Sequence, residues 1–295
     1  MWTRLVGATI LLLLLLACEA LGPAAPSAEK AIPQPLTEAR LLFLHRSVGG
    51  NLVRYGEPDM YGVLDQLNVD HGTANQLWHH FCGAPPYGDR YYDHQDQQVL
   101  PNFGPALSEP QSATPEYWSR VFCDDAPEYV AARDSIDNFR VIAVKCGYDN
   151  TVPYATDRCG QWRAHFNAMK DSEFFRDPRL RVVMLGFPPI REGMLGATQA
   201  DADSARGFSQ WLEEHWPRGR GNLFVFPLFD HMAGADNWLR DEYELDVPND
   251  SHPNLLGSTE VGGALARFLH EVAMQKAPVD DDVRPDLNSL SNQRP

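Results

Sequence analysis

Two short segments, far apart in the chain, contain residues that could together perform nucleophilic catalysis. Ser47 follows an apolar run and precedes Gly49 and Gly50, so its hydroxyl could be exposed where backbone N–H groups approach a developing oxyanion. Near the other end of the chain, His252 lies two residues after Asp250. A carboxylate at that spacing can accept the imidazole N–H and fix the tautomer of a general base. Ser47, His252 and Asp250 therefore predict a nucleophile, its base and the residue that orients the base.

Each segment also has a simpler interpretation. Ser47 with its glycines could be a helix N-cap and a tight turn, and Asp250 to His252 could be an ordinary surface loop. A phosphate-binding loop is not indicated, because neither G-x-x-x-x-G-K-[ST] nor G-x-G-x-x-G occurs. A second pair, Asp230 and His231, ranks below His252 as a base because a Gly-containing loop follows it.

Short apolar runs predict the elements that must position these residues. Their near-continuous apolar character is typical of strands buried on both faces of a parallel sheet. The predicted strands are Arg40 to His45, Phe139 to Lys145, Leu180 to Phe187 and Asn222 to Pro227. Ser47 would then lie beyond the carboxyl end of the first strand, where sites form in such sheets.

Two segments between and after these runs have helical periodicity. Apolar residues recur at spacings of three and four in Asp201 to Trp216 and again in Gly257 to Met274, where Ser258 or Thr259 could be the cap. Strands that alternate with helices predict an α/β sandwich.

The segments LLFLHRSVGGN and NDSHPNLLG, with VVMLGFPPI between them, resemble the SGNH (GDSL-type) hydrolase superfamily. The chain order differs from that of α/β-hydrolases, and no G-x-S-x-G elbow occurs. The resemblance implies a flavodoxin-like three-layer α/β/α sandwich with a central parallel sheet. It also implies a serine hydrolase that acts on ester bonds and uses neither a metal nor an organic cofactor.

The chain departs from the family's pattern at the nucleophile and at the acid. His45-Arg46-Ser47 stands where the family usually has Gly-Asp-Ser. The family's acid usually lies three residues before its histidine, a position that Asn249 holds here. We expect Asp250 to orient His252, with Asp246 or a backbone carbonyl as the alternatives.

The oxyanion donors that the resemblance implies are harder to place. Gly147-Tyr148-Asp149-Asn150 stands where the family has Gly-x-Asn-Asp, so Asn150 is either a side-chain donor or a turn asparagine. Gly72 is the candidate for the family's second glycine, and Gly49 could serve through its backbone instead.

The N-terminus predicts export. One basic residue, Arg4, precedes an apolar run too short for a transmembrane helix, and the run ends in Leu15-Leu16-Ala17-Cys18, which resembles a lipobox. We expect a signal peptide over residues 1–18 with Cys18 as lipid anchor, a linker over 19–37, the hydrolase-like domain over 38–275 and a disordered tail over 276–295. This implies a lipoprotein of the bacterial cell envelope, and the alternative is an ordinary signal peptide with an incidental cysteine.

Composition limits the partners. Lys and Arg number 25 against 40 Asp and Glu, a net charge of −15, which argues against nucleic acid. An even number of further cysteines in an exported chain favours disulfides, in any of three connectivities. We expect Cys82 with Cys123 and Cys146 with Cys159, and no metal site, because no C-x-x-C or His pair at ligand spacing accompanies them.

Other residues leave the substrate open. Lys145 could bind an anionic group or form an ordinary ion pair. Trp78, His79 and His80, with the cluster Tyr91 to His94, could line a sugar-binding surface or pack a loop insertion. We expect an esterase that removes O-acyl groups from a glycan or envelope polymer, with lipid or small soluble esters as other substrates. The alternative is a non-catalytic lipoprotein that binds a glycan or a partner protein.

Overall fold

The computed structural model describes residues 36–81, 90–99, 114–147, 156–247 and 250–275. The chain divides into residues 1–32 and 33–295, and every described element belongs to the second unit. Cys18, Cys82 and Asn150 lie outside the described residues, so the lipid anchor and the predicted domain boundaries stay predictions.

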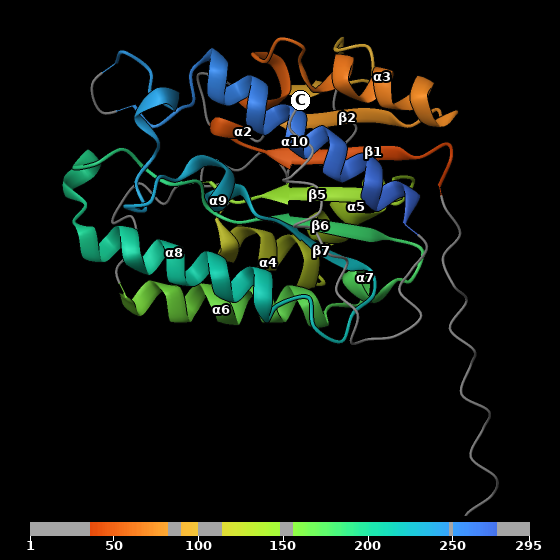
Figure 1. Cartoon of the computed structure of the whole chain (residues 1–295). Helices are drawn as coiled ribbons and strands as arrows, with labels where there is room; N and C mark the ends of the chain where they lie inside the picture. The colour runs from red at the N-terminus through yellow and green to blue at the C-terminus, as the bar shows by residue number, and fades with distance from the viewer. Residues whose placement is uncertain (1–35, 82–89, 100–113, 148–155, 248–249, 276–295) are drawn as a thin grey trace, which may run out of the picture. The chain divides into compact units, whose positions relative to one another are not determined.

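The described part of the chain is built around a seven-stranded sheet (Figure 1). Its order is β4-β3-β2-β1-β5-β6-β7. Five neighbouring strands, β2, β1, β5, β6 and β7, are parallel. β3 and β4 add an antiparallel edge beside β2. The strands are β1 (Arg40–His45), β2 (Gln76–Phe81), β3 (Arg90–Tyr92), β4 (Gln98–Val99), β5 (Val141–Lys145), β6 (Arg181–Leu185) and β7 (Leu223–Phe226).

Helices cover both faces of this sheet. One face packs against α2 (Val48–Arg54), α3 (Met60–His71), α9 (Leu228–Met232) and α10 (Leu255–Met274). The other packs against α4 (Pro115–Cys123), α5 (Pro127–Ile136), α6 (Thr156–Asp171), α7 (Glu173–Arg176) and α8 (Gln199–Glu214). Figure 1 shows α2, α3 and α10 on one side of the strands and α4, α6 and α8 on the other. The α/β three-layer sandwich expected from the sequence is confirmed, with the 2-1-3-4-5 order of parallel strands found in flavodoxin-like folds.

The alternation of side chains along β1 and β5 divides the core. Leu41 and Phe43 of β1 belong to the cluster under α10, whereas Leu42 and Leu44 belong to the cluster under α4 and α6. The same alternation places His45 on the α10 face, because it continues the series from Leu41 and Phe43. Lys145 lies beside His45 on the next strand, since Leu44 pairs with Val144.

The four predicted strands agree with the structure to within two residues at each end. The sequence missed β2, because QLWHHF has no apolar run and no clean alternation. The prediction that His79 and His80 pack a loop insertion or line a sugar site is wrong: both lie in β2 and are 1% exposed. Their place in the sheet is set by pairing with β1, which propensity does not show.

The two predicted helices correspond to α8 and α10, but the cap of α10 differs. Asn254 is the N-cap, and its side chain accepts a hydrogen bond from the Gly257 N–H at 3.1 Å. Ser258 and Thr259 lie inside the helix, where the Thr259 hydroxyl donates to the Leu255 carbonyl. The predicted Ser258 or Thr259 cap is therefore wrong. Asparagine is as good a cap as serine, and its position one residue after Pro253 sets the helix start.

The predicted disulfides are absent among the described residues. Cys123, Cys146 and Cys159 all carry free thiols, which rules out both predicted pairs in this structure. Cys146 and Cys159 are buried in the core cluster under α4 and α6, where they pack as small apolar side chains. Burial raises the pKa of the Cys146 thiol to about 12, so the reactive thiolate is disfavoured.

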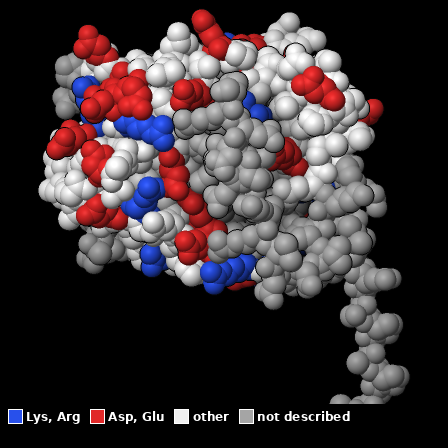
Figure 2. Space-filling model, in the orientation of Figure 1, with Lys and Arg blue, Asp and Glu red and all other residues white. Residues whose placement is uncertain are grey.

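The surface agrees with the acidic composition. On the face shown in Figure 2, acidic side chains predominate and the basic ones are scattered among them, with no basic stripe over its described part. No described helix is long and apolar enough to cross a membrane.

Candidate active site

Ser47 occupies the sharp turn that joins β1 to α2. Its backbone has φ 54° and ψ −116°, a positive φ that is rare for a residue with a Cβ. Such a conformation persists only where the surrounding structure holds it, and it is common at functional sites. Ser47 stands at the N-cap position of α2 but makes no capping hydrogen bond. The Ser47 side chain therefore does not act as a helix cap, which was the simpler interpretation.

The Ser47 hydroxyl meets the imidazole of His252 instead. Ser47 Oγ lies 2.5 Å from His252 Nε2, although 205 positions separate the two residues in the chain. On the other side of the ring, His252 Nδ1 lies 2.6 Å from Asp250 Oδ1. An ionised carboxylate only accepts, so the ring proton belongs on Nδ1 and Nε2 is the free acceptor for the serine proton. This is the order of contacts that a nucleophile, a base and its orienting acid require.

Asp250 is held as a carboxylate. Partial burial raises its pKa, but the backbone N–H of His252, at 2.8 Å, and the ring N–H outweigh it, so the pKa of Asp250 lies below its ordinary value. The expected orienting residue is in contact with His252, whereas Asp246 makes no such contact and Asn249 lies outside the described residues. His252 is 33% exposed and Asp250 28%, so solvent and ligands can reach the site.

Arg191 fixes the loop that carries Asp250 and His252. Its backbone N–H donates to the Ser251 hydroxyl at 2.9 Å, and its guanidinium lies 2.6 Å from the Glu244 carboxylate. The guanidinium also donates to the carbonyl groups of Leu245 and Val247. No sequence motif singles out Arg191, although its position after Pro188 and Pro189, beyond the carboxyl end of β6, places it where sites form in such sheets.

Two asparagines join this loop to the neighbouring helices. The Asn254 side chain donates to the carbonyls of Glu242 and Glu244 at 2.8 and 3.0 Å while capping α10. The Asn51 side chain of α2 donates to the Pro253 carbonyl at 3.2 Å. The helix after the serine and the loop that carries the histidine are thus held together directly.

Two of the three predicted oxyanion donors, Gly49 and Gly72, lie among the described residues. The Gly49 N–H donates to the Arg46 carbonyl at 3.1 Å, so it is engaged within the turn. Gly72 ends α3 on the N-terminal side of β2, whereas Ser47 follows the carboxyl end of the parallel strand β1. The two are separated by the length of the strands, about 16 Å, and Gly72 is not an oxyanion donor. Asn150 lies outside the described residues and stays a prediction.

Gly49 has a different role, which is spatial. A Cβ placed there would lie 2.5 Å from the Cβ of His45. The first turn of α2 can lie this close to the end of β1 only because residue 49 has no side chain.

Lys145 does not form the ordinary ion pair that was one of its two interpretations. It is fully buried, and its Nζ donates to the Cys146 carbonyl at 2.9 Å, with no carboxylate partner among the described residues. Burial is the main reason that the pKa of Lys145 falls to about 7, and the nearby Arg46 lowers it further.

Asp230 and His231, the second Asp-His pair, make their contacts away from Ser47. Asp230 forms an ion pair with Arg206 of α8, and the His231 ring stacks on Phe226 at a centroid distance of 4.8 Å. Neither contacts Ser47, in agreement with the lower rank of this pair.

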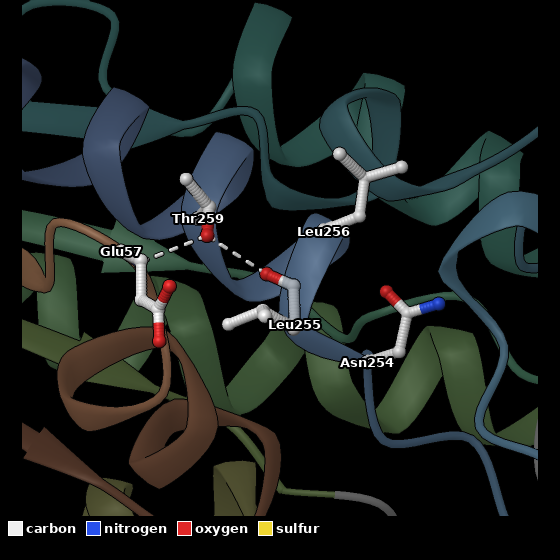
Figure 3. A pocket seen from close by; sticks show the side chains of 5 residues that line it. All are labelled: Glu57, Asn254, Leu255, Leu256 and Thr259. Carbon is white, nitrogen blue, oxygen red and sulfur yellow. Dashed lines mark hydrogen bonds between the residues drawn. The ribbon is translucent and has the colours of Figure 1, made fainter.

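An open hollow lies beside the start of α10, close to His252 in the chain (Figure 3). Its lining residues are Glu57, Asn254, Leu255, Leu256 and Thr259. Leu255 is 52% exposed and Leu256 46%, which is unusual for leucine at the first turn of a helix that is otherwise deeply buried. The hollow offers an apolar surface next to the candidate site.

No group of three or more potential metal ligands occurs among the described residues.

Comparison with known proteins gives structural neighbours only. No family model and no curated protein matches the sequence. A solved lipase, Lip_vut3 from a goat rumen metagenome, is 11% identical over 81% of this chain and all of that chain, with a TM-score of 0.49. A GDSL-like lipase from Bacteroides thetaiotaomicron is 12% identical over 87% of this chain and 96% of that chain, with a TM-score of 0.41. These similarities concern the fold.

Proposed function

We propose that this chain is a serine hydrolase that acts on esters. The observation that carries the proposal is the continuous contact from Ser47 Oγ through the His252 ring to Asp250, at 2.5 and 2.6 Å. Serine is a weak nucleophile unless a base takes its proton, and a base is effective when a third group orients it. The strained backbone of Ser47, together with the absence of a capping bond, supports a chemical role for its hydroxyl.

In this mechanism Ser47 Oγ attacks the acyl carbonyl carbon while His252 Nε2 takes the hydroxyl proton. The carbonyl π bond opens, and its oxygen becomes the oxyanion of a tetrahedral intermediate. Asp250 keeps the proton on Nδ1 and stabilises the imidazolium that forms. When the intermediate collapses, the leaving alcohol takes the proton from His252 and Ser47 is acylated. Water, activated by the same histidine, then releases the acid and restores the serine.

The experiment is labelling with a fluorophosphonate, which forms a covalent bond to an activated serine. The full chain should be labelled, and Ser47→Ala and His252→Ala should both abolish labelling. Matched controls are Ser204→Ala on α8 and His215→Ala at the C-cap of the same helix. This helix lies on the other face of the sheet, so both changes should leave labelling unchanged. Folded wild-type protein that stays unlabelled would refute the proposal and favour a non-catalytic protein that binds a glycan or a partner.

We further propose an O-acyl ester on a glycan or envelope polymer as the substrate, acted on outside the cytoplasm by a lipid-anchored protein. The support is in the sequence: Cys18 in Leu-Leu-Ala-Cys after the N-terminal apolar run indicates a lipid-anchored protein outside the cytoplasm. An acetylated polysaccharide, a phospholipid and a short nitrophenyl ester, compared by kcat/KM, distinguish the candidate substrates. Acyl modification of Cys18, measured by mass spectrometry on membrane fractions, tests the anchor.

A further inference from the structure

A line of polar side chains lies under the turn that carries Ser47. His45, the last residue of β1, has its Nε2 2.8 Å from Nδ1 of His79 in β2. Beyond it, His79 Nε2 faces Asp96 Oδ1 at 3.7 Å, and Asp96 Oδ2 accepts a hydrogen bond from Arg54 at 2.8 Å. Both imidazoles are at most 1% exposed. His45, at one end of this line, lies against the first turn of α2, and Arg54, at the other end, is the last residue of α2. The line therefore contacts both ends of this short helix.

The charges on this line fix where its protons lie. Burial raises the pKa of Asp96, but His79 and Arg54 outweigh it, so the pKa lies below its ordinary value and the group is a carboxylate. The Asp96 oxygen at 3.7 Å is too far for a hydrogen bond, but its negative charge favours the His79 tautomer with the proton on Nε2, which leaves Nδ1 as an acceptor. His45 must then donate from its own Nε2. Burial lowers the pKa of both histidines, so both rings are neutral.

The rings are also held sterically. The His79 ring stacks on Tyr92 with centroids 4.6 Å apart and planes at 8°, and on His45 at 5.0 Å and 19°. The His45 ring in turn lies against the first turn of α2, where a Cβ on Gly49 would be 3.0 Å from Nδ1 of His45. A rotation of His45 would therefore push against the backbone two residues after Ser47.

We propose that His79 and Asp96 are positioning residues for the nucleophile: they hold His45 in one tautomer and one orientation, and His45 holds the turn that keeps Ser47 Oγ against His252. The inference rests on the proposed function. Neither residue touches the reacting atoms, and a displacement of the serine by about 1 Å is enough to slow a reaction by about 100-fold.

The test compares three variants in the full chain. His79→Phe keeps the ring stacked on Tyr92 but cannot accept from His45. His79→Asn keeps a side-chain oxygen near the position of Nδ1. His80→Phe is the matched control, because His80 is equally buried in β2 but its neighbour on β1 is Leu44, so it lies on the opposite face of the sheet.

We expect His79→Phe to lower kcat and the maximal rate of phosphonate labelling by about 10- to 100-fold with KM nearly unchanged, because the serine moves while the binding surface stays. His79→Asn should recover most of the loss. His80→Phe should change thermal stability without this effect on kcat. Nitrogen-15 NMR of the histidines should show His45 protonated on Nε2 in the wild type and a changed His45 signal in His79→Phe.

Two results would overturn the inference while leaving the proposed function intact: wild-type kcat in folded His79→Phe, or a wild-type His45 protonated on Nδ1. Wild-type protein that is folded but neither labelled nor active would instead refute the proposed function and, with it, a positioning role. A loss of kcat in His79→Phe that His79→Asn does not recover, with the His45 signal unchanged, would show a merely structural effect and also count against the inference.

Discussion

Substituting Gly49 by alanine tests the close packing under the nucleophile. An ideal Cβ at this position lies 2.5 Å from Cβ, 2.8 Å from Cγ and 3.0 Å from Nδ1 of His45. Carbon atoms in contact are normally at least about 3.5 Å apart, so the alanine is too close by about 1 Å. The His45 Cβ is attached to β1, which pairs with β2 on one side and β5 on the other. The turn at the start of α2 must therefore move instead of the strand.

This movement has two measurable costs. Overpacking of this kind lowers the free energy of unfolding by about 1–3 kcal/mol, against which the better helix propensity of alanine returns at most about 1 kcal/mol. Ser47 precedes the alanine by two residues and moves with the turn, so its 2.5 Å contact with His252 is lost. A displacement of about 1 Å should slow phosphonate labelling by about 10- to 100-fold.

Gly160→Ala is the matched control. Gly160 also lies inside a helix, α6, but a Cβ there meets nothing within 4 Å. Urea unfolding and labelling rates are measured on both variants. The control should be as stable as the wild type or more so, with an unchanged labelling rate. If Gly49→Ala labels at the wild-type rate and unfolds at the wild-type urea concentration, the steric argument for the nucleophile turn is wrong.

Three further predictions concern the base, the helix contact and the buried histidines. Asp250→Asn should slow labelling by about 10²–10⁴-fold at unchanged thermal stability, because the neutral amide no longer fixes the His252 tautomer; labelling at the wild-type rate would contradict this. Gly262→Ala should destabilise by about 1–3 kcal/mol in urea unfolding, because its Cβ would overlap the Leu52 carbonyl oxygen, whereas Gly263→Ala meets only the flexible end of the Arg267 side chain and should not. For His80, burial lowers the pKa from 6.5 to about 3, so between these values the unfolded chain binds the extra proton and stability falls as the pH falls. From pH 7 to pH 5 this histidine alone should account for a loss of about 2 kcal/mol, and His80→Phe should lose that much less over the same range.

Among the features that the sequence did determine, the parallel strands were the clearest. Runs such as RLLFLH and VIAVK have no polar alternation, and a strand can bury both faces only inside a sheet covered by helices. The position of Ser47 beyond the first strand then follows from chain direction alone, since the carboxyl ends of parallel strands share one edge. Asp250 and His252 were predicted as a pair because two residues are a short enough separation for a carboxylate to reach its neighbour's ring.

The sequence could not determine which polar residues would be buried. His79 and His80 were expected to line a sugar-binding surface or to pack a loop insertion, because QLWHHF has no apolar run and no clean alternation. A buried imidazole needs a hydrogen-bond partner, and His79 finds one in His45, 34 positions away in the chain. The disulfide predictions were also wrong because they depend on tertiary contacts. Their even number predicted bridges, but whether two thiols can join depends on the distance between their backbones, which spacing along the chain does not give.

The sequence by itself determined the class of fold and the three residue types at the candidate site, because both are local: apolar runs, a serine after a strand and a short Asp-x-His segment. Only the tertiary structure decided that these residues meet, with the Ser47 hydroxyl at the His252 ring across 205 positions of chain. It also decided what holds them there: Arg191 under the base loop and His45 under the serine turn. Such contacts depend on the packing of several elements at once, and packing specificity arises from shapes that no single segment contains.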